Sequence, residues 1–136
     1  MATRALLTVG LDPARTPEST WRLFAGTDPA EIRAGLASAR ERLTARGFAM
    51  ESLLLGPDDD IGALLRAALA ERPYDCVVVG AAVRLDPALT PLLETIVNVL
   101  RDAAPGATVC FSTHPANTPD AVARWFPVGD EPGPDG

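Results

Sequence analysis

The polar residues with the most scope for chemistry follow one apolar run, in the stretch CFSTHPANTPDAVARW: Ser112, Thr113, His114 and Asn117. His114 is the only histidine in the chain, and a histidine acts as a general acid or base only with a partner in hydrogen-bond reach. Asp12 is the only carboxylate that we expect near it, and no GxSxG motif surrounds Ser112. We therefore interpret His114 as a binding or surface residue, and the sequence identifies no catalytic residue.

Two other apolar runs are also followed by residues that suit ligand binding. GLDP follows the first run, and GAAVR, from Gly80 to Arg84, follows the third. A glycine before two alanines lets a ligand approach backbone N–H groups closely, and Arg84 supplies positive charge in an acidic chain. The alternative is that Gly80 serves a tight turn and Arg84 is only solvated. The binding interpretation predicts a small polar or anionic ligand held by Asp12, Gly80, Arg84, Thr113, His114 and Asn117.

Motifs that would identify a cofactor or a metal are absent from the sequence. There is no GxxxxGK[ST] and no GxGxxG, and VGLDP lacks the phosphate loop that flavodoxins use. One histidine with two distant cysteines makes a poor zinc set. Cys76 and Cys110 each lie in an apolar run, so we expect buried free thiols and no metal site. The cofactor stays unknown.

Four short runs are predicted to be strands: Ala5–Val9, Phe48–Leu55, Cys76–Val79 and Thr108–Phe111. Three of them are almost continuously apolar, which is expected of strands that helices cover on both faces. The second run has Glu51 and Ser52 inside it, and this mixed pattern suits an edge strand.

Helical patterns alternate with these runs, because apolar residues recur at helical spacing in the segments between them. Three pairs resemble an N-cap followed by proline at the first helical position: Asp28-Pro29, Asp86-Pro87 and Thr118-Pro119. Gly47 is expected to stop the first helix.

The alternation of strands and helices predicts an α/β fold. We expect a three-layer α/β/α sandwich whose doubly wound parallel sheet has about four strands in the flavodoxin-like order 2-1-3-4. Ligands bind such sheets beyond the carboxyl ends of the strands, and the switch point here lies between strands 1 and 3. We predict one domain over residues 1–127 and a disordered acidic Gly/Pro tail over 128–136.

The connection from Leu11 to Thr27 is long for a compact domain, and such loops are usually functional or structured on their own. It carries Trp21 and Phe24. One interpretation is a hydrophobic plug on the end of the sheet, and the other is a lid or a dimer contact.

Charge and hydropathy restrict the partners. The chain has 136 residues and a formal net charge of −6, which argues against nucleic acid or an anionic membrane as the main partner. No apolar run approaches the roughly 20 residues of a membrane helix. We expect a cytoplasmic protein that binds a small molecule and could form a homodimer.

Segments including VGLDP, YDCVVVGAAVRLDP and CFSTHPANTPDAVARW resemble an uncharacterised family of short bacterial proteins. The resemblance covers most of residues 5–126 and implies a flavodoxin-like or receiver-like fold, with no established activity. Receiver domains place a phosphoacceptor aspartate at the end of strand 3, where this chain has Gly80. The competing hypothesis is therefore a degenerate receiver-like interaction module that acts by dimerisation or docking, without catalysis.

Overall fold

Residues 3–24, 28–114 and 117–127 are described by the computed structural model of the chain. The tail that we expected to be disordered, 128–136, lies outside this part. Within the described residues, no helix combines the length and the apolar character needed to cross a membrane.

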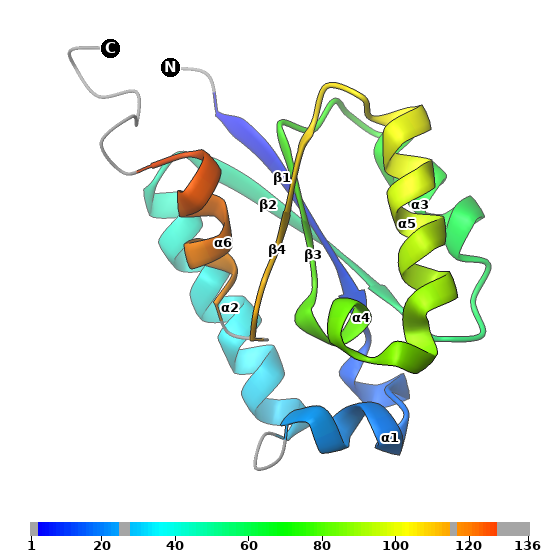
Figure 1. The fold of residues 1–136 in the computed structure, drawn as a ribbon. Coiled ribbons are helices and arrows are strands. Elements are labelled where there is room, and N and C mark those ends of the chain that lie inside the picture. The colour runs from blue at the N-terminus through cyan, green and yellow to red at the C-terminus, as the bar shows by residue number, and fades with distance from the viewer. Residues whose placement is uncertain (1–2, 25–27, 115–116, 128–136) are drawn as a thin grey trace.

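The centre of the protein is one parallel sheet (Figure 1). Its strands are β1 (Arg4–Leu11), β2 (Phe48–Leu55), β3 (Cys76–Val79) and β4 (Thr108–Phe111). The order is β2-β1-β3-β4, so the predicted fold class and strand order are confirmed, with β2 at an edge. β1 is longer than predicted at both ends because Arg4 pairs with Phe48 and Leu11 pairs with Leu55.

Helices cover both faces of this sheet (Figure 1). α3 (Ile61–Ala70) and α5 (Thr90–Ala103) lie on one face, while α2 (Pro29–Ala45) and α6 (Thr118–Trp125) lie on the other. The result is the three-layer arrangement that the alternating pattern predicts.

Short elements follow the carboxyl ends of two strands. After β1 come η1 (Pro13–Arg15), α1 (Glu18–Trp21) and η2 (Arg22–Phe24), and after β3 come α4 (Ala81–Leu85) and η3 (Pro87–Leu89). No helix was predicted from the sequence for the segment directly after β3. Its first two residues are alanines, the best helix formers, and the segment makes a short helix instead.

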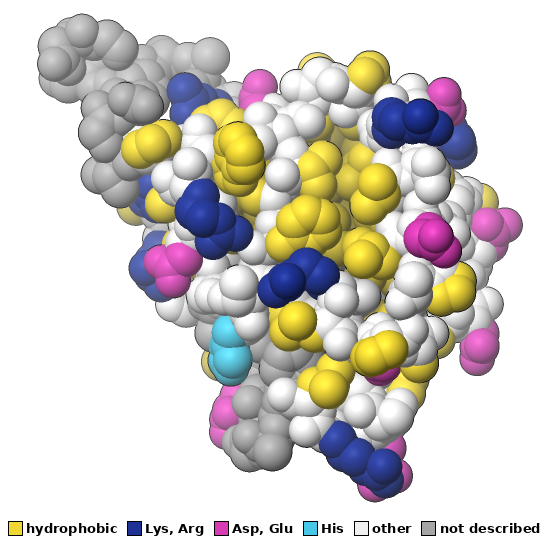
Figure 2. Space-filling view, viewed as in Figure 1, with side chains coloured by type: hydrophobic (Ala, Val, Ile, Leu, Met, Phe, Trp, Pro, Cys, Tyr) yellow, Lys and Arg dark blue, Asp and Glu magenta, His cyan; other side chains and the backbone are white. Residues whose placement is uncertain are grey.

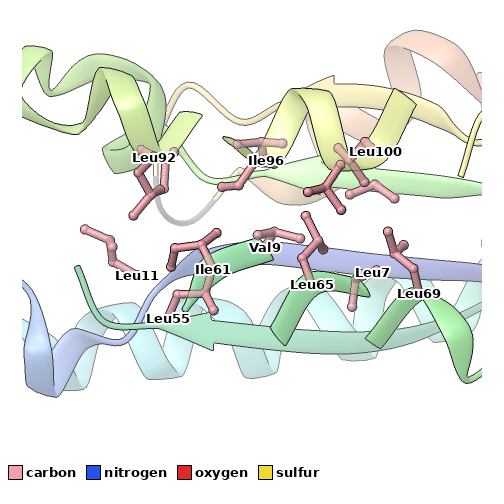
Figure 3. Packing of buried hydrophobic residues seen from close by; sticks show 14 of the residues in the cluster. Leu7, Val9, Leu11, Leu55, Ile61, Leu65, Leu69, Leu92, Ile96 and Leu100 are labelled. Atoms are coloured by element: carbon pink, nitrogen blue, oxygen red, sulfur yellow. The ribbon is translucent and has the colours of Figure 1, made fainter. Parts of the chain in front are cut away.

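The core has two layers, one on each side of the sheet. On one side, Leu7 and Val9 of β1 pack with Leu65 of α3 and Ile96 of α5 (Figure 3). On the other, Leu6 packs under α2 and α6 in a second cluster. Side chains alternate between the faces of a strand, so β1 serves both layers.

Both cysteines are buried, and their thiols are free, as predicted. Their sulfurs lie 3.4 Å apart on neighbouring strands in the layer under α6. The contact with Cys110 and the burial raise the pKa of Cys76.

The helix ends confirm two sequence predictions and correct two others. The Asp28 carboxylate accepts from the N–H of Glu31 at the start of α2, and Gly47 follows that helix with φ of 89°. Asp86 caps η3 and not the long helix, because one 3-10 turn precedes α5. The N-cap of α6 is Asn117, whose carbonyl accepts the first helical hydrogen bonds, and Thr118 is already helical.

Candidate ligand pocket

A cavity of about 80 Å³ lies at the carboxyl ends of the strands, on the face that α2 and α6 cover. It opens beside the point where β1 and β3 adjoin, which is the predicted switch point. The residues that line it are Thr8, Val9, Gly10, Leu11, Pro13, Thr16, Thr20, Trp21, Ile32, Leu36, Leu54, Val78, Gly80, Ala81, Ala82, Ser112 and Thr118. One water molecule needs about 10–15 Å³ of such space, so the pocket has room for a larger occupant.

Small residues at the ends of the strands create this hollow. On the α2/α6 side, β1 presents Leu6, then Thr8, then Gly10, so the side chains shrink towards the carboxyl end. A Cβ on Gly10 would have only the Cα of Gly80 within 4 Å, at 4.0 Å. The two glycine backbones therefore lie close together and form a floor from which no side chain rises.

Apolar side chains form the walls, and the long connection after β1 forms the roof. Ile32 and Leu36 of α2 stand on one side. We call Pro13, Thr16, Thr20 and Trp21 the roof, since these residues of the connection line the pocket beyond the strand ends. Trp21 is half-buried there. The connection thus lies where the plug and lid interpretations both require it, while the side chain of Phe24 lies outside the described part.

A buried hydrogen bond fastens the roof to the segment after β3. The hydroxyl of Thr20 donates to Oδ2 of Asp86 across 2.6 Å, and both residues are buried, with exposed fractions of 1% and 6%. Oδ1 of Asp86 accepts from the N–H of Ala88. The Asp86 carboxylate therefore holds two segments that are distant in the sequence.

The other end of the roof is fixed by charge. Asp12 caps η1, and the N–H of Ala14 together with Arg15 and Arg33 holds the pKa of Asp12 below its ordinary value. Arg15 forms two ion pairs: its Nε lies 3.3 Å from the carboxylate of Asp12, and its Nη1 lies 3.0 Å from that of Asp59. These contacts join the connection to the loop after β2.

Asp59 anchors that loop. Its carboxylate accepts from the N–H of Gly56 across 2.8 Å and pairs with Arg15. The hydrogen bond from Gly56, and then the guanidinium of Arg15, lowers the pKa of Asp59.

The hydroxyl groups of the pocket fall into two classes. Three of them have partners: Thr8 donates to Ser52, Thr16 to the carbonyl of Asp12, and Thr20 to Asp86. The other two are Ser112 and Thr118, which are 2% and 4% exposed. Neither of these two hydroxyls has a hydrogen-bond partner among the residues that the structure describes. Because no fully buried side-chain oxygen in the described part lacks a partner, both hydroxyl oxygens remain accessible at the surface of the cavity. They are therefore the groups through which the pocket can bind a polar atom.

The predicted corner after β4 is bonded to itself. Oδ1 of Asn117 accepts from the N–H groups of Thr113 and His114, at 3.1 and 3.2 Å, and its Nδ2 donates to Oγ1 of Thr113. Thr113 and His114 are exposed, and none of the three residues lines the pocket. This corner orients the start of α6, which presents Thr118 to the cavity.

The other predicted site residues do not lie together in the pocket either. Gly80 lines the pocket, and Asp12 supports the roof from outside the cavity. Arg84 is exposed on α4 and does not line the pocket. In the described part of the chain, no three His, Cys, Asp or Glu side chains come together as a metal site would require.

Comparison with known proteins adds no relative: no family model and no curated protein matches this chain. The chemistry of the pocket therefore has to be argued from its own residues.

Several lining residues were absent from the predicted site. Thr8 and Gly10 could have been found, because they interrupt the apolar run RALLTVGL at every second position, on one face of β1. Ile32 and Leu36 carried no such signal, since apolar residues on a helix face normally fill a core. Thr118 was interpreted as a cap, which concealed its position beside the cavity.

Proposed function

We propose that this protein binds a small molecule in the pocket between the ends of β1 and β3. The observation that supports the proposal is the pair of hydroxyls of Ser112 and Thr118, which line the pocket, stay accessible from it and lack a partner within the described residues. A ligand that covers these hydroxyls must give them a hydrogen-bond partner, because leaving a covered polar group unpaired costs about 1–3 kcal/mol. A ligand with a polar atom would supply the missing one. In the same proposal, the chain is a cytoplasmic member of the bacterial family that it resembles.

A pocket-filling variant tests the proposal. A Cβ on Gly10 makes only an ordinary contact with the Cα of Gly80 at 4.0 Å, so Gly10→Val would place methyl groups on the floor of the pocket without backbone strain. Gly106→Val is the matched control, because a Cβ there has nothing within 4 Å and Gly106 does not line the pocket. A library of small organic fragments is added to each ¹⁵N-labelled protein, and NMR chemical shifts are recorded.

We expect some fragments to shift the amide signals of Gly10 and Gly80 and the indole signal of Trp21. Gly10→Val should abolish these shifts, while Gly106→Val should keep them. If no fragment moves the pocket signals, or if folded Gly10→Val binds as wild type does, the proposal is wrong.

The second candidate function is the receiver-like interaction module, and the position of β4 in the sheet supports it. This strand lies at an edge of the sheet, with β3 as its neighbour. Figure 2 shows hydrophobic side chains gathered over this part of the face, and Val97 of α5 and Leu85 of α4 are more than two-fifths exposed. Unpaired edge strands can associate with a second copy. Sedimentation equilibrium separates the candidates: a dimer that Val97→Glu dissociates supports the module, and a monomer throughout contradicts it.

A further inference from the structure

We infer that the ligand of this pocket is a neutral molecule with a short apolar body and one polar group, such as an alcohol or a primary amide. Its polar group would exchange hydrogen bonds with Ser112 and Thr118, and its carbon chain would lie against the walls. This inference rests on the proposed function and narrows the class of ligand. The sequence predicted a polar or anionic ligand, whereas this inference is that the ligand carries no charge.

The charge of the lining is the first argument. Among the described residues that line the pocket, none carries a charged side chain. The two arginines next to roof residues in sequence already pair with carboxylates: Arg15 with Asp12 and Asp59, and Arg22 with Glu18. Moving an ion out of water without a compensating partner is far more costly than moving a neutral amide or hydroxyl. A carboxylate or a phosphate would therefore lose its hydration and gain no cation in return.

A cationic ligand meets the same difficulty. The carboxylate closest to the roof, Asp86, is buried and is not part of the lining. Its two oxygens already accept from Thr20 and from the N–H of Ala88. Because Asp86 does not line the pocket, an ammonium group in the cavity would have no carboxylate among the described lining residues to pair with.

The two hydroxyls identify the polar end of the ligand. A serine or threonine hydroxyl both donates and accepts, so Ser112 and Thr118 can bind a group that does the same. An alcohol or a primary amide meets this condition. A pure hydrocarbon would leave both hydroxyls without partners when it displaced water.

The walls identify the other end. Ile32 and Leu36 of α2 and Trp21 of the roof bring aliphatic and aromatic surface to the cavity. Contact with such surface favours apolar atoms in rough proportion to the area that is buried. The ligand therefore combines both characters in a molecule of few atoms.

Probes that share one carbon chain and differ in charge test the inference. Butyramide, sodium butyrate and n-butylammonium chloride are titrated into the ¹⁵N-labelled full chain at constant ionic strength and pH 7. Chemical shifts of Gly10, Gly80 and the Trp21 indole report occupancy of the pocket. Ligands of this size are expected to bind with millimolar dissociation constants. Ser112→Ala removes one anchoring hydroxyl, and Ser38→Ala, an exposed position on α2, is its control.

We expect butyramide to bind at least about tenfold more tightly than either ion, since the ions are not paired in the pocket. Ser112→Ala should weaken butyramide several-fold, and Ser38→Ala should not. Butyrate or butylammonium binding as tightly as butyramide would overturn the neutral class and leave the proposed function standing. If none of the three binds while a library fragment does, this inference alone fails. If neither set binds, both fail.

Discussion

The hydrogen bond between Thr20 and Asp86 makes a quantitative prediction about the roof. Thr20→Val keeps the shape of the side chain and removes only the hydroxyl that donates to the buried carboxylate at 2.6 Å. Hydrogen bonds to charged groups contribute about 1.5–3 kcal/mol, and here the loss leaves one Asp86 oxygen buried without its donor. We expect the free energy of unfolding to fall by about 2 kcal/mol. With a urea m-value of about 2 kcal/mol/M, the unfolding midpoint should fall by about 1 M.

Thr118→Val is the matched control for this measurement. It is the same substitution at another buried residue of the same pocket, but the Thr118 hydroxyl has no partner within the described residues. Its free energy of unfolding should stay within about 0.5 kcal/mol of wild type, since no protein hydrogen bond is lost. Urea unfolding followed by circular dichroism measures both variants. Equal effects of Thr20→Val and Thr118→Val would refute the reasoning, because it assigns the difference to the Asp86 contact.

Three further predictions concern the roof and its surroundings. Ligand binding should change the fluorescence of Trp21, which lines the pocket, and Trp21→Phe should remove the change because Trp125 is 60% exposed and does not line the pocket. Arg15→Ala should raise the pKa of Asp59, measured by NMR titration. Because that pKa is depressed in the folded state, the stabilisation from Arg15 should exist above about pH 4 and disappear as the pH falls through the folded pKa; a pH-independent loss would contradict this. His114→Gln should keep ligand affinity within about twofold of wild type, since His114 is exposed and does not line the pocket. A larger loss would show that His114 takes part in binding.

The sequence predicted the sheet well because three of its strands are almost continuously apolar and the fourth has the mixed pattern of an edge strand. The bounds of Phe48–Leu55 and Cys76–Val79 agree with the structure, as does the strand order. The helix ends were less predictable because a proline after a polar residue fits more than one position. Thr118 and Asn117 both suit an N-cap, and the hydrogen bonds of the Asn117 carbonyl decide between them.

The pocket lies at the edge of the sheet where a site was predicted, but of the predicted site residues Gly80 alone is among the described residues that line it. The ends of β1 and β3 and the connection with Trp21 do meet there. The lining residues were harder to predict. Charged and polar residues are the usual sequence signals of a binding site, whereas this pocket results from side chains that are small or missing. Whether Arg84 is solvated or directed into a cleft depends on α4, whose helical geometry the pattern did not reveal.

The end of β3 is where the binding and receiver-like hypotheses differ most in physical terms. A receiver domain needs an acidic side chain there, but a Cβ on Gly80 would lie 3.4 Å from the Cα of Gly10 and 3.5 Å from the carbonyl oxygen of Val9. The first distance is at the limit of ordinary contact, and a carboxylate would also approach a carbonyl oxygen that already accepts from the N–H of Gly80. A Cβ would fit there at ordinary contact distance, so the argument against phosphotransfer is that this position has no carboxylate. The close backbones of Gly10 and Gly80 form the floor of the pocket. The glycine that argues against phosphotransfer is therefore the same residue that makes room for a ligand.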